Sequence, residues 1–176
     1  MVLAVHDCPV PVVAKVDGVC VGAGLGLAVA TDVIWCTERA RFSAILAKRG
    51  LSLDFGTSWL LLQRIGIHKA KELTFTGRTV SAPDALTLGL VNSVLPTDQL
   101  DAATREIVDA EAAGPPVVLS LAKRELDSAG GASLAQTLEV EAMAQSVNVQ
   151  TDDLKEAPIS YVERRPPNFS GRYECR

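Results

Sequence analysis

A glycine triplet is the feature that most constrains what this chain can fold into. Gly22, Gly24 and Gly26 follow a valine-rich run and precede an apolar, alanine-rich stretch. This order predicts a short strand, a tight turn at Gly22, and a buried helix that begins near Ala23. Because glycine has no Cβ, a ligand can approach the backbone closely at this turn. The first N–H groups of the helix have no acceptor within the helix, so they are free to bind such a ligand.

Three kinds of ligand suit this turn: a pyrophosphate, a carboxylate, or a carbonyl oxygen that gains negative charge during a reaction. The dinucleotide-binding pattern G-x-G-x-x-G does not fit, because the third glycine comes one residue early and Glu38 follows too soon. The lysine of a Walker motif is also absent from the turn. Nucleotide binding therefore stays an alternative, as does a purely structural turn that lets a strand and a helix pack closely.

Composition excludes several classes of protein. The 176 residues suffice for about one domain, and 48% hydrophobic residues exclude global disorder. With 5% aromatic residues, the core must be aliphatic and rich in alanine. A net charge of −4 without a basic stripe argues against nucleic-acid binding. No apolar stretch is uniform enough for a membrane span, and Met1–Val5 is unlike a signal peptide, so we expect a cytoplasmic protein without membrane association.

The cysteines indicate a reducing compartment. They form no C-x-x-C pair, and neither histidine lies at the spacing of a zinc site. We therefore expect free thiols, two or three of them buried as small apolar side chains, and no metal site. The cysteines are Cys8, Cys20, Cys36 and Cys175.

Hydrophobic periodicity and the glycine and proline breakers place strands mainly in the first half of the chain and helices mainly in the second. The expected strands are residues 12–16, 19–21, 32–36, 40–44, 79–81 and 90–95. The expected helices are residues 23–30, 56–65, 68–76, 82–88, 98–113, 116–129, 133–149 and 154–163, with no long element in residues 1–10. We expect the chain to divide into a core formed by residues 1–97 and a helical C-terminal region formed by residues 98–176.

The text around the glycine triplet resembles a known family. Residues 11–28, which read PVVAKVDGVCVGAGLGLA, closely resemble the core signature of the crotonase family, the enoyl-CoA hydratase/isomerase superfamily. Further matches follow in the family's order and extend over nearly the whole chain. They are TDVI at residues 31–34, ARF at 40–42, GRTVSA at 77–82, GLVN at 89–92 and RRPPNF at 164–169.

The resemblance implies an α/β fold: a crotonase-like ββα spiral core, incomplete at the N-terminus, followed by a helical C-terminal region used for trimerisation. The sequence lacks the family's N-terminal half, so we expect that it begins late or is a half-module. The resemblance also implies a homo-oligomer, either a trimer or a hexamer. The implied substrate is an acyl-CoA thioester, so that coenzyme A enters as part of the substrate and no separate cofactor is needed.

The resemblance also implies where the substrate binds. In the family, two backbone N–H groups polarise the thioester carbonyl and stabilise the enolate that forms there. One of these groups corresponds to the Ala23 N–H, and the other belongs to the family's N-terminal half. The implied substrate-binding residues are Gly22, Gly24, Phe55, Trp59 and Tyr161.

The acid and base groups depart from the hydratases of the family. Those enzymes use two glutamates, and the matching positions here are Gly26 and Leu46, neither of which can transfer a proton. One carboxylate remains, Asp54, which resembles the aspartate of some family isomerases and of a dehalogenase branch. A single carboxylate suffices for a double-bond shift, because it removes a proton from one carbon and returns it at another. The alternative role of Asp54 is that of an N-cap or turn aspartate for the helix that begins near Gly56.

Apolar neighbours favour the catalytic role. Leu53, Phe55 and Trp59 are expected to exclude water around Asp54 and to raise its pKa, which suits a general base. The expected function is therefore isomerisation of an enoyl-CoA thioester, with the Ala23 N–H as oxyanion donor and Asp54 as acid and base. One alternative is a protein that is called an enoyl-CoA hydratase because of its fold and not because of its reaction. The other is a truncated, non-catalytic paralogue that binds acyl-CoA or assembles with full-length partners.

Overall fold

The computed structural model describes residues 1–173, which form two compact units. The first unit contains Met1–Cys8 and Val12–Val108. The second contains Pro9–Pro11 and the chain from Asp109 onward. The domain boundary expected after residue 97 stays a prediction.

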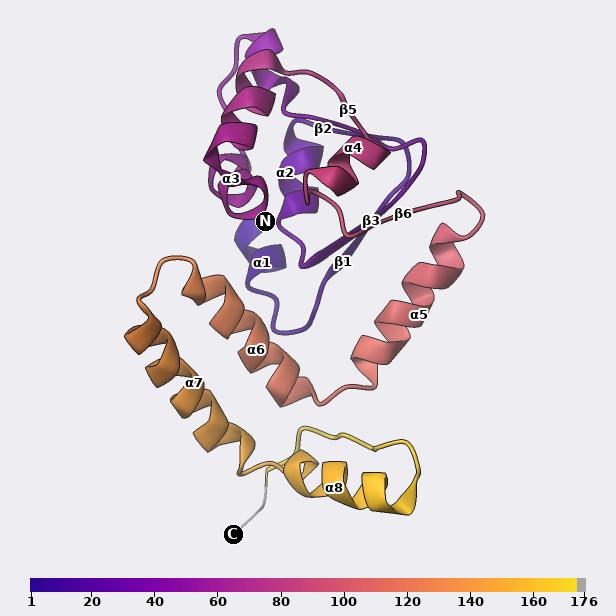
Figure 1. The fold of residues 1–176 in the computed structure, drawn as a ribbon, viewed down its shortest axis with the longest axis vertical. Coiled ribbons are helices and arrows are strands. Elements are labelled where there is room, and N and C mark those ends of the chain that lie inside the picture. The colour runs from indigo at the N-terminus through magenta and orange to yellow at the C-terminus, as the bar shows by residue number, and fades with distance from the viewer. Residues whose placement is uncertain (174–176) are drawn as a thin grey trace. The chain divides into compact units, whose positions relative to one another are not determined.

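Two successive β–β–α turns build most of the first unit (Figure 1). The first turn consists of β1 (Val13–Val16), β2 (Val19–Val21) and α2 (Ala23–Val29), and the second of β3 (Val33–Thr37), β4 (Arg41–Ser43) and α3 (Thr57–Thr76). β1 pairs with β3 and β2 pairs with β4, both in parallel. Each turn thus adds one strand to each of two sheets, which is the ββα spiral that the family resemblance implies.

The third turn departs from this pattern. It consists of β5 (Val80–Ser81), α4 (Ala82–Thr87) and β6 (Ser93–Leu95). β5 is antiparallel to β4, whereas β6 is parallel to β3, so the sheet orders are β1-β3-β6 and β2-β4-β5. β1 and β2 are therefore edge strands. The strand expected from residue 90 begins later, because Leu90 and Val91 donate their N–H groups to the Ala85 carbonyl in the turn after α4.

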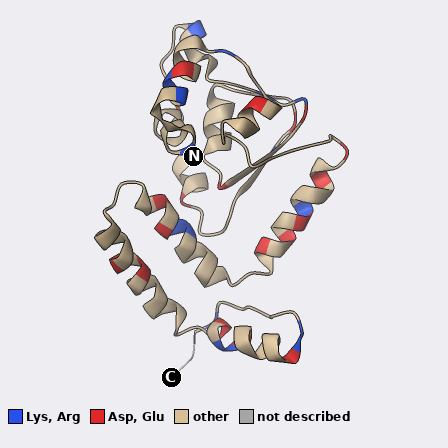
Figure 2. Ribbon diagram, in the orientation of Figure 1, with Lys and Arg blue, Asp and Glu red and all other residues tan. Residues whose placement is uncertain are grey.

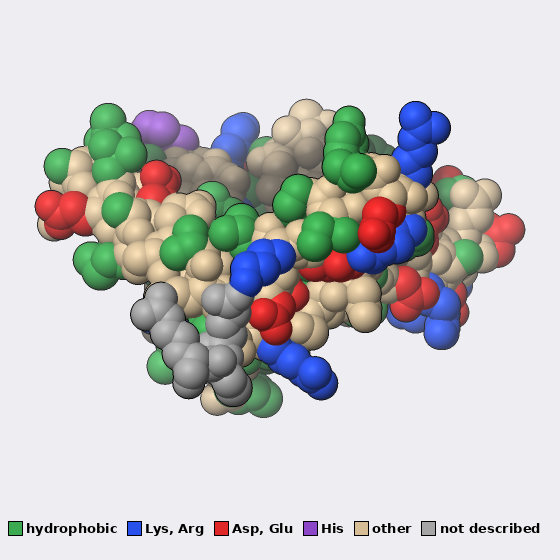
Figure 3. Space-filling view, turned by 90° about the horizontal axis from the view of Figure 1, so that it is seen from below, with side chains coloured by type: hydrophobic (Ala, Val, Ile, Leu, Met, Phe, Trp, Pro, Cys, Tyr) green, Lys and Arg blue, Asp and Glu red, His purple; other side chains and the backbone are tan. Residues whose placement is uncertain are grey.

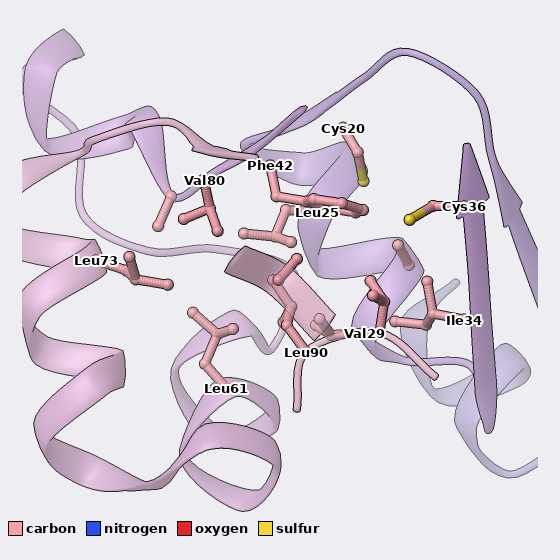
Figure 4. Packing of buried hydrophobic residues seen from close by; sticks show 14 of the residues in the cluster. Cys20, Leu25, Val29, Ile34, Cys36, Phe42, Leu61, Leu73, Val80 and Leu90 are labelled. Carbon is pink, nitrogen blue, oxygen red and sulfur yellow. The ribbon is translucent and has the colours of Figure 1, made fainter. Parts of the chain in front are cut away.

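Aliphatic side chains from the strands, α2 and α3 form the core of the first unit (Figure 4). Leu25, Val29, Ile34 and Phe42 are at most 1% exposed. This packing confirms the predicted aliphatic core. It also fixes α2, and hence the glycine turn that precedes it, against both sheets.

Two cysteines belong to the same core. Burial raises the pKa of the Cys20 and Cys36 thiols to about 11, so both stay protonated near neutral pH. They and Cys8 are free cysteines, whereas the prediction for Cys175 falls outside the described residues. Within residues 1–173, no cluster of His, Cys, Asp and Glu side chains has the arrangement of a metal site.

The first unit begins with a short helix, α1 (Val2–His6), where the sequence signals no long element. Its first turn has no side-chain cap, and a helix this short is unstable by itself. Contacts with α3 stabilise it: Val2 lies beside Gly56, and the His6 ring meets the Trp59 ring edge-on at a centroid distance of 5.7 Å. Tertiary packing therefore explains an element that propensity does not predict.

A glycine interrupts α3 at the predicted place. Gly66, with φ 74° and ψ 163°, separates the two helices expected from the sequence, so that α3 is kinked there. The irregular segment before α3 contains a 3₁₀ helix, η1 (Ile45–Arg49), which ends at Gly50 in a left-handed conformation.

The second unit is helical. It contains α6 (Pro116–Ala129), α7 (Leu134–Asn148), α8 (Asp153–Glu163) and the last residues of α5 (Leu100–Ala112). Pro116 occupies the first position of α6, where a missing N–H costs no hydrogen bond. Ser133 and Gln136 form a capping box at the start of α7. These starts agree with the predicted ones.

Polar contacts tie the segment after α8 back to that helix. The Asp153 carboxylate is 4% exposed and accepts the backbone N–H of Gly171 at 3.0 Å. Glu156 accepts hydrogen bonds from Arg165 Nη2 (2.9 Å) and from the backbone N–H of Asn168 (2.7 Å). The Arg165 guanidinium, helped by that N–H, lowers the pKa of Glu156 to about 2.

Basic and acidic residues are interspersed along both units (Figure 2). One ion pair joins Lys15 of β1 to Asp101 of α5. Among the residues that the structure describes, every helix lacks the combination of length and apolar character that a bilayer crossing requires.

Candidate functional site

Gly22 forms the tight turn that the sequence predicts. Its φ of 55° and ψ of −126° lie in a region that residues with a Cβ rarely adopt. Its N–H donates to the Ser43 carbonyl of β4 (3.1 Å), and its own carbonyl accepts the Gly26 N–H (3.1 Å). These two bonds attach the turn to β4 and to α2, so the backbone that follows has a fixed direction.

The Ala23 N–H is a free donor at this turn. It begins α2, so it has no acceptor within the helix, and no other acceptor bonds it among residues 1–173. Ala23 is partly exposed, which allows a ligand to reach the donor. A Cβ on Gly22 would lie 3.7 Å from Leu46 Cδ2 and 3.9 Å from Ile45 Cγ2, so apolar side chains lie beside the turn. Apolar surroundings would strengthen a hydrogen bond from this N–H to a ligand, and its predicted role as oxyanion donor stays a prediction.

An open hollow of about 430 Å³ runs along α2. Gly24 and Leu27 of α2 line it, together with Val16 and Cys20 of the strands. Its walls are mainly apolar. Gly24, one of the predicted substrate-binding residues, therefore lines an open hollow, and its contact with a substrate stays a prediction.

Asp54 lies in the segment before α3 and is exposed. Its backbone carbonyl accepts the Thr57 N–H (2.9 Å), whereas its carboxylate has no partner among the described residues. The N-cap of α3 is Gly56, and no side chain caps this end of the helix. Asp54 is therefore not the N-cap of α3, although its backbone carbonyl closes the turn before this helix, and its carboxylate makes no bond to α3.

The turn that carries Asp54 packs directly on α2. A Cβ built on Gly26 would lie 2.6 Å from Phe55 Cβ and 2.6 Å from Thr57 Oγ1. Such distances are too short for any real Cβ, so the turn occupies the space that a side chain at position 26 would fill. Gly26 lies about one helical turn beyond Ala23. The structure thus brings the Asp54 segment and the glycine turn together on one short helix.

The apolar enclosure expected around Asp54 is incomplete. Leu53 and Phe55 are half-buried, but Trp59 is 47% exposed and Asp54 itself is exposed. Trp59 lies on an outer side of α3, where its ring contacts His6. In the described part of the chain, these three side chains therefore leave the carboxylate in contact with solvent.

Tyr161 is the one predicted site residue that lies in the second unit. It belongs to α8, and its side chain is 85% exposed. Its contact with a substrate stays a prediction.

Two residues at the candidate site have a structural role that the sequence pattern does not predict. Gly26 is buried in α2, and Thr57 is 1% exposed with its Oγ1 lacking a hydrogen-bond partner. A glycine inside an otherwise alanine-rich helix signals a close approach of another backbone. That signal does not say which segment approaches, and Phe55 and Thr57 are distant in sequence.

Comparisons with known proteins agree with this architecture. Residues 1–172 match the family model described as enoyl-CoA hydratase/isomerase. A probable enoyl-CoA hydratase of Rhodobacter capsulatus is 30% identical over 96% of this chain and 66% of its own length. A mitochondrial Delta(3,5)-Delta(2,4)-dienoyl-CoA isomerase of Dictyostelium discoideum is 30% identical over 94% of this chain and 57% of its own length. The chain thus spans less than two thirds of the length of these curated relatives.

Solved structures share the same fold. The crystal structure of an enoyl-CoA hydratase from Bacillus anthracis has a TM-score of 0.94 at 30% identity, over 97% of this chain and 66% of that one. The crystal structure of a putative enoyl-CoA hydratase/isomerase from Mycobacterium abscessus has a TM-score of 0.93 at 33% identity, over the same shares. The family match, these similarities and the ββα spiral lead to one conclusion: the chain belongs to the enoyl-CoA hydratase/isomerase family, the crotonase superfamily.

Proposed function

We propose that this chain serves an enzyme that shifts a carbon–carbon double bond in an enoyl-CoA thioester, with Asp54 carrying the proton. The observation that carries the proposal is that the unpartnered Asp54 carboxylate belongs to a turn packed on the helix that begins at Ala23. Two relatives named as dienoyl-CoA isomerases, from Dictyostelium discoideum and Arabidopsis thaliana, are 30% and 31% identical and support the same reaction class.

In the proposed mechanism, the Ala23 N–H donates a hydrogen bond to the thioester oxygen. Asp54 removes a proton from one carbon of the enoyl chain, and the electron pair moves toward that oxygen to form an enolate. The N–H stabilises the negative charge, and a preorganised donor of this kind contributes about 10²–10³ in rate. Asp54 then returns the proton to a different carbon. The double bond has moved, and the composition of the thioester is unchanged.

Hydration is the second candidate. Relatives named as enoyl-CoA hydratases from Rhodobacter capsulatus and Thermus thermophilus favour it. The reaction adds a water oxygen to one carbon and a proton to the next, a task that the resemblance assigns to two glutamates. Gly26 and Leu46 stand at those positions, so a single carboxylate fits isomerisation better. In both reactions coenzyme A enters as part of the substrate, and we propose no separate cofactor.

The products separate these two reactions. The protein is incubated with a 3-enoyl-CoA and, separately, with a 2-enoyl-CoA, and the thioesters are identified by mass and by conjugation of the double bond. We expect the unconjugated substrate to become conjugated at unchanged mass. A main product that is heavier by one water molecule would contradict isomerisation and support hydration.

A matched pair of variants tests the role of Asp54. Asp54→Asn should lower the isomerisation rate by about 10²–10⁴, because the amide cannot carry the proton. Asp109→Asn, which changes an exposed carboxylate on α5, should leave the rate unchanged. Equal rates for Asp54→Asn and the unmodified protein would remove Asp54 from the mechanism. Acyl-CoA binding without turnover of any enoyl-CoA would favour the non-catalytic alternative.

We also propose that the protein is a homo-oligomer, a trimer or a hexamer. Hydrophobic side chains lie at the surface among charged ones (Figure 3). In the second unit, Leu126, Leu134 and Val162 are 75–79% exposed, and apolar surface of this kind favours association. Light scattering on the eluting protein gives the mass of the assembly, and a monomer at micromolar concentration would contradict this proposal.

A further inference from the structure

We propose that Gly26 is a positioning residue for Asp54. Because it has no side chain, Phe55 and Thr57 pack against α2 at this position, a contact surface that we call the seat. The seat thereby sets where the Asp54 carboxylate lies relative to the Ala23 N–H. This inference rests on the proposed function, because it concerns the geometry of the same site. On resemblance alone, position 26 is notable only because it lacks the glutamate of the hydratases. The inference gives the glycine at this position a role of its own.

Space, rather than backbone conformation, requires a glycine here. Gly26 lies inside α2 and does not have the positive φ that would demand glycine. Alanine is the better residue for such a helical position. A Cβ there would nevertheless lie 2.6 Å from Phe55 Cβ and from Thr57 Oγ1, and 3.3 Å from the Phe55 carbonyl oxygen. At Gly24, in the same helix, a Cβ would meet nothing within 4 Å.

The seated turn contains two unfavourable features that its packing must offset. Phe55 has a φ of 49°, which a large aromatic residue rarely adopts. Thr57 is 1% exposed, and its Oγ1 has no hydrogen-bond partner. Phe55 and Thr57 are also the two residues that contact α2 at Gly26. The contact with α2 helps to offset these two costs, together with the backbone bond from Thr57 to the Asp54 carbonyl.

Asp54 is connected to the same seat through the backbone. Its carbonyl accepts the Thr57 N–H at 2.9 Å, so Asp54 follows the position of Thr57. Ala23 and Gly26 belong to one helix, whose geometry fixes the donor relative to the seat. A Cβ at position 26 would have to push the turn outward until Phe55 Cβ reached an ordinary contact of at least 3.4 Å. A displacement approaching 1 Å in a catalytic group costs about 10² in rate.

Kinetics on the full chain test whether the seat acts through Asp54. Gly26→Ala should lower kcat by about 10² with a smaller effect on KM. In an Asp54→Asn background the same substitution should have no further effect, because the group it displaces is already gone. Gly131→Ala is the matched control, since its Cβ would meet nothing within 4 Å and it lies in the second unit.

A compensating variant separates crowding from general damage to α2. Phe55→Gly together with Thr57→Ala removes the two atoms that a Cβ at position 26 would meet at 2.6 Å. On this background, Gly26→Ala should cost less than threefold in kcat, whereas in the unmodified turn it costs about 10². An equal cost on both backgrounds would overturn the inference.

Hydrogen exchange at the Thr57 amide tests the seat without reference to activity. Gly26→Ala should speed this exchange, because the bond to the Asp54 carbonyl loosens, and Gly131→Ala should not. Unchanged exchange, or unchanged kcat in an enzyme that depends on Asp54, would overturn the inference and leave the proposed function intact. Faster exchange in a protein whose Asp54→Asn variant is fully active would confirm the seat and reject the proposed function.

Discussion

The two units of this chain differ in how each is stabilised internally. In the first unit, a continuous aliphatic cluster extends from Cys20 to Val91 and includes both sheets, α2 and α3. In the second unit, the described residues that are fully buried are few: Ala144, Thr151, Asp153 and Ser160. No residue of α6 is buried. Packing between α6 and α7, helix caps and charged contacts support the second unit, with few buried side chains among them.

This difference agrees with the location of the proposed site. Proton transfer and oxyanion binding need groups held to within a fraction of an ångström, and a close-packed core provides this constraint. Ala23 and Asp54 both belong to the unit with the core. The second unit exposes large apolar side chains, which suits a surface that other chains cover. Paired substitutions, one in each unit, can test this difference between a packed core and an exposed apolar surface.

The largest expected effect is on stability. Phe42→Ala, at a side chain that is 1% exposed, should lower the free energy of unfolding by about 3–5 kcal/mol. Leu126→Ala, at a side chain that is 78% exposed, should change it by less than about 0.5 kcal/mol in dilute protein. Denaturant unfolding measures both. A Leu126→Ala cost that appears only at high protein concentration would place this residue between chains, and equal costs in dilute protein would contradict the comparison.

The second effect is on catalysis. Ala23→Pro replaces the N–H by the ring Cδ of proline and leaves the helix intact, because proline suits the first position of a helix. A residue before proline prefers an extended conformation. Gly22, at φ 55° and ψ −126°, has nearly the mirror image of that conformation, which glycine adopts as readily. Gly22 is therefore compatible with a proline at position 23. We expect kcat to fall by about 10²–10³.

The second unit supplies the control for this substitution. Leu134→Pro changes the first residue of α7, which follows Ser133 at φ −76° and ψ 159°. This variant should keep full activity, and circular dichroism should show unchanged helix content in both variants. Full activity of Ala23→Pro would exclude its N–H as the oxyanion donor.

The smallest effect is the acid sensitivity of each unit. In the second unit, the Arg165 guanidinium and the Asn168 N–H lower the pKa of Glu156 from its ordinary 4.5 to about 2. The folded state therefore favours the ionised carboxylate, so this stabilisation is complete above about pH 4.5 and is lost as the pH falls toward 2. Glu156→Gln should make the unfolding temperature of this unit less dependent on pH in that window. Parallel curves for both proteins would contradict this.

The first unit contains a counterpart. Hydrogen bonds from Arg39 and Thr37 lower the pKa of Asp17 from 3.8 to about 2. By the same sign, its stabilisation is present above about pH 3.8 and is lost toward pH 2. Asp17→Asn should affect the first unit and leave the second unchanged, which hydrogen exchange resolved by segment can distinguish.

Local signals predicted most of the elements. Pro116 and Ser133 mark helix starts that the structure confirms, and Gly66 marks the break in α3. α1 was not predicted because its stability comes from contacts with Gly56 and Trp59 rather than from its own sequence. Propensity acts over a few residues, so it misses elements that only tertiary contacts stabilise.

The site was predictable only in part. The tight turn at Gly22 follows from the glycine pattern, and the structure confirms it, whereas the roles of Ala23 and Asp54 rest on resemblance and stay predictions. The contact of Gly26 with Phe55 and Thr57 joins segments that are far apart in the chain, and nothing local specifies it. The exposure of Asp54 also differs from expectation, because apolar neighbours in sequence need not surround a side chain in space.

The contact at Gly26 restricts how this chain could acquire another chemistry. A glutamate introduced at that position would collide with the turn as it is packed here, so the single substitution would displace the proposed proton carrier, Asp54, before it added a new one. Evolution or engineering toward such a carboxylate must therefore reshape residues 55–57 first, or at the same time. The order of mutational steps is constrained because Phe55 and Thr57 occupy the space that a Cβ at position 26 would need.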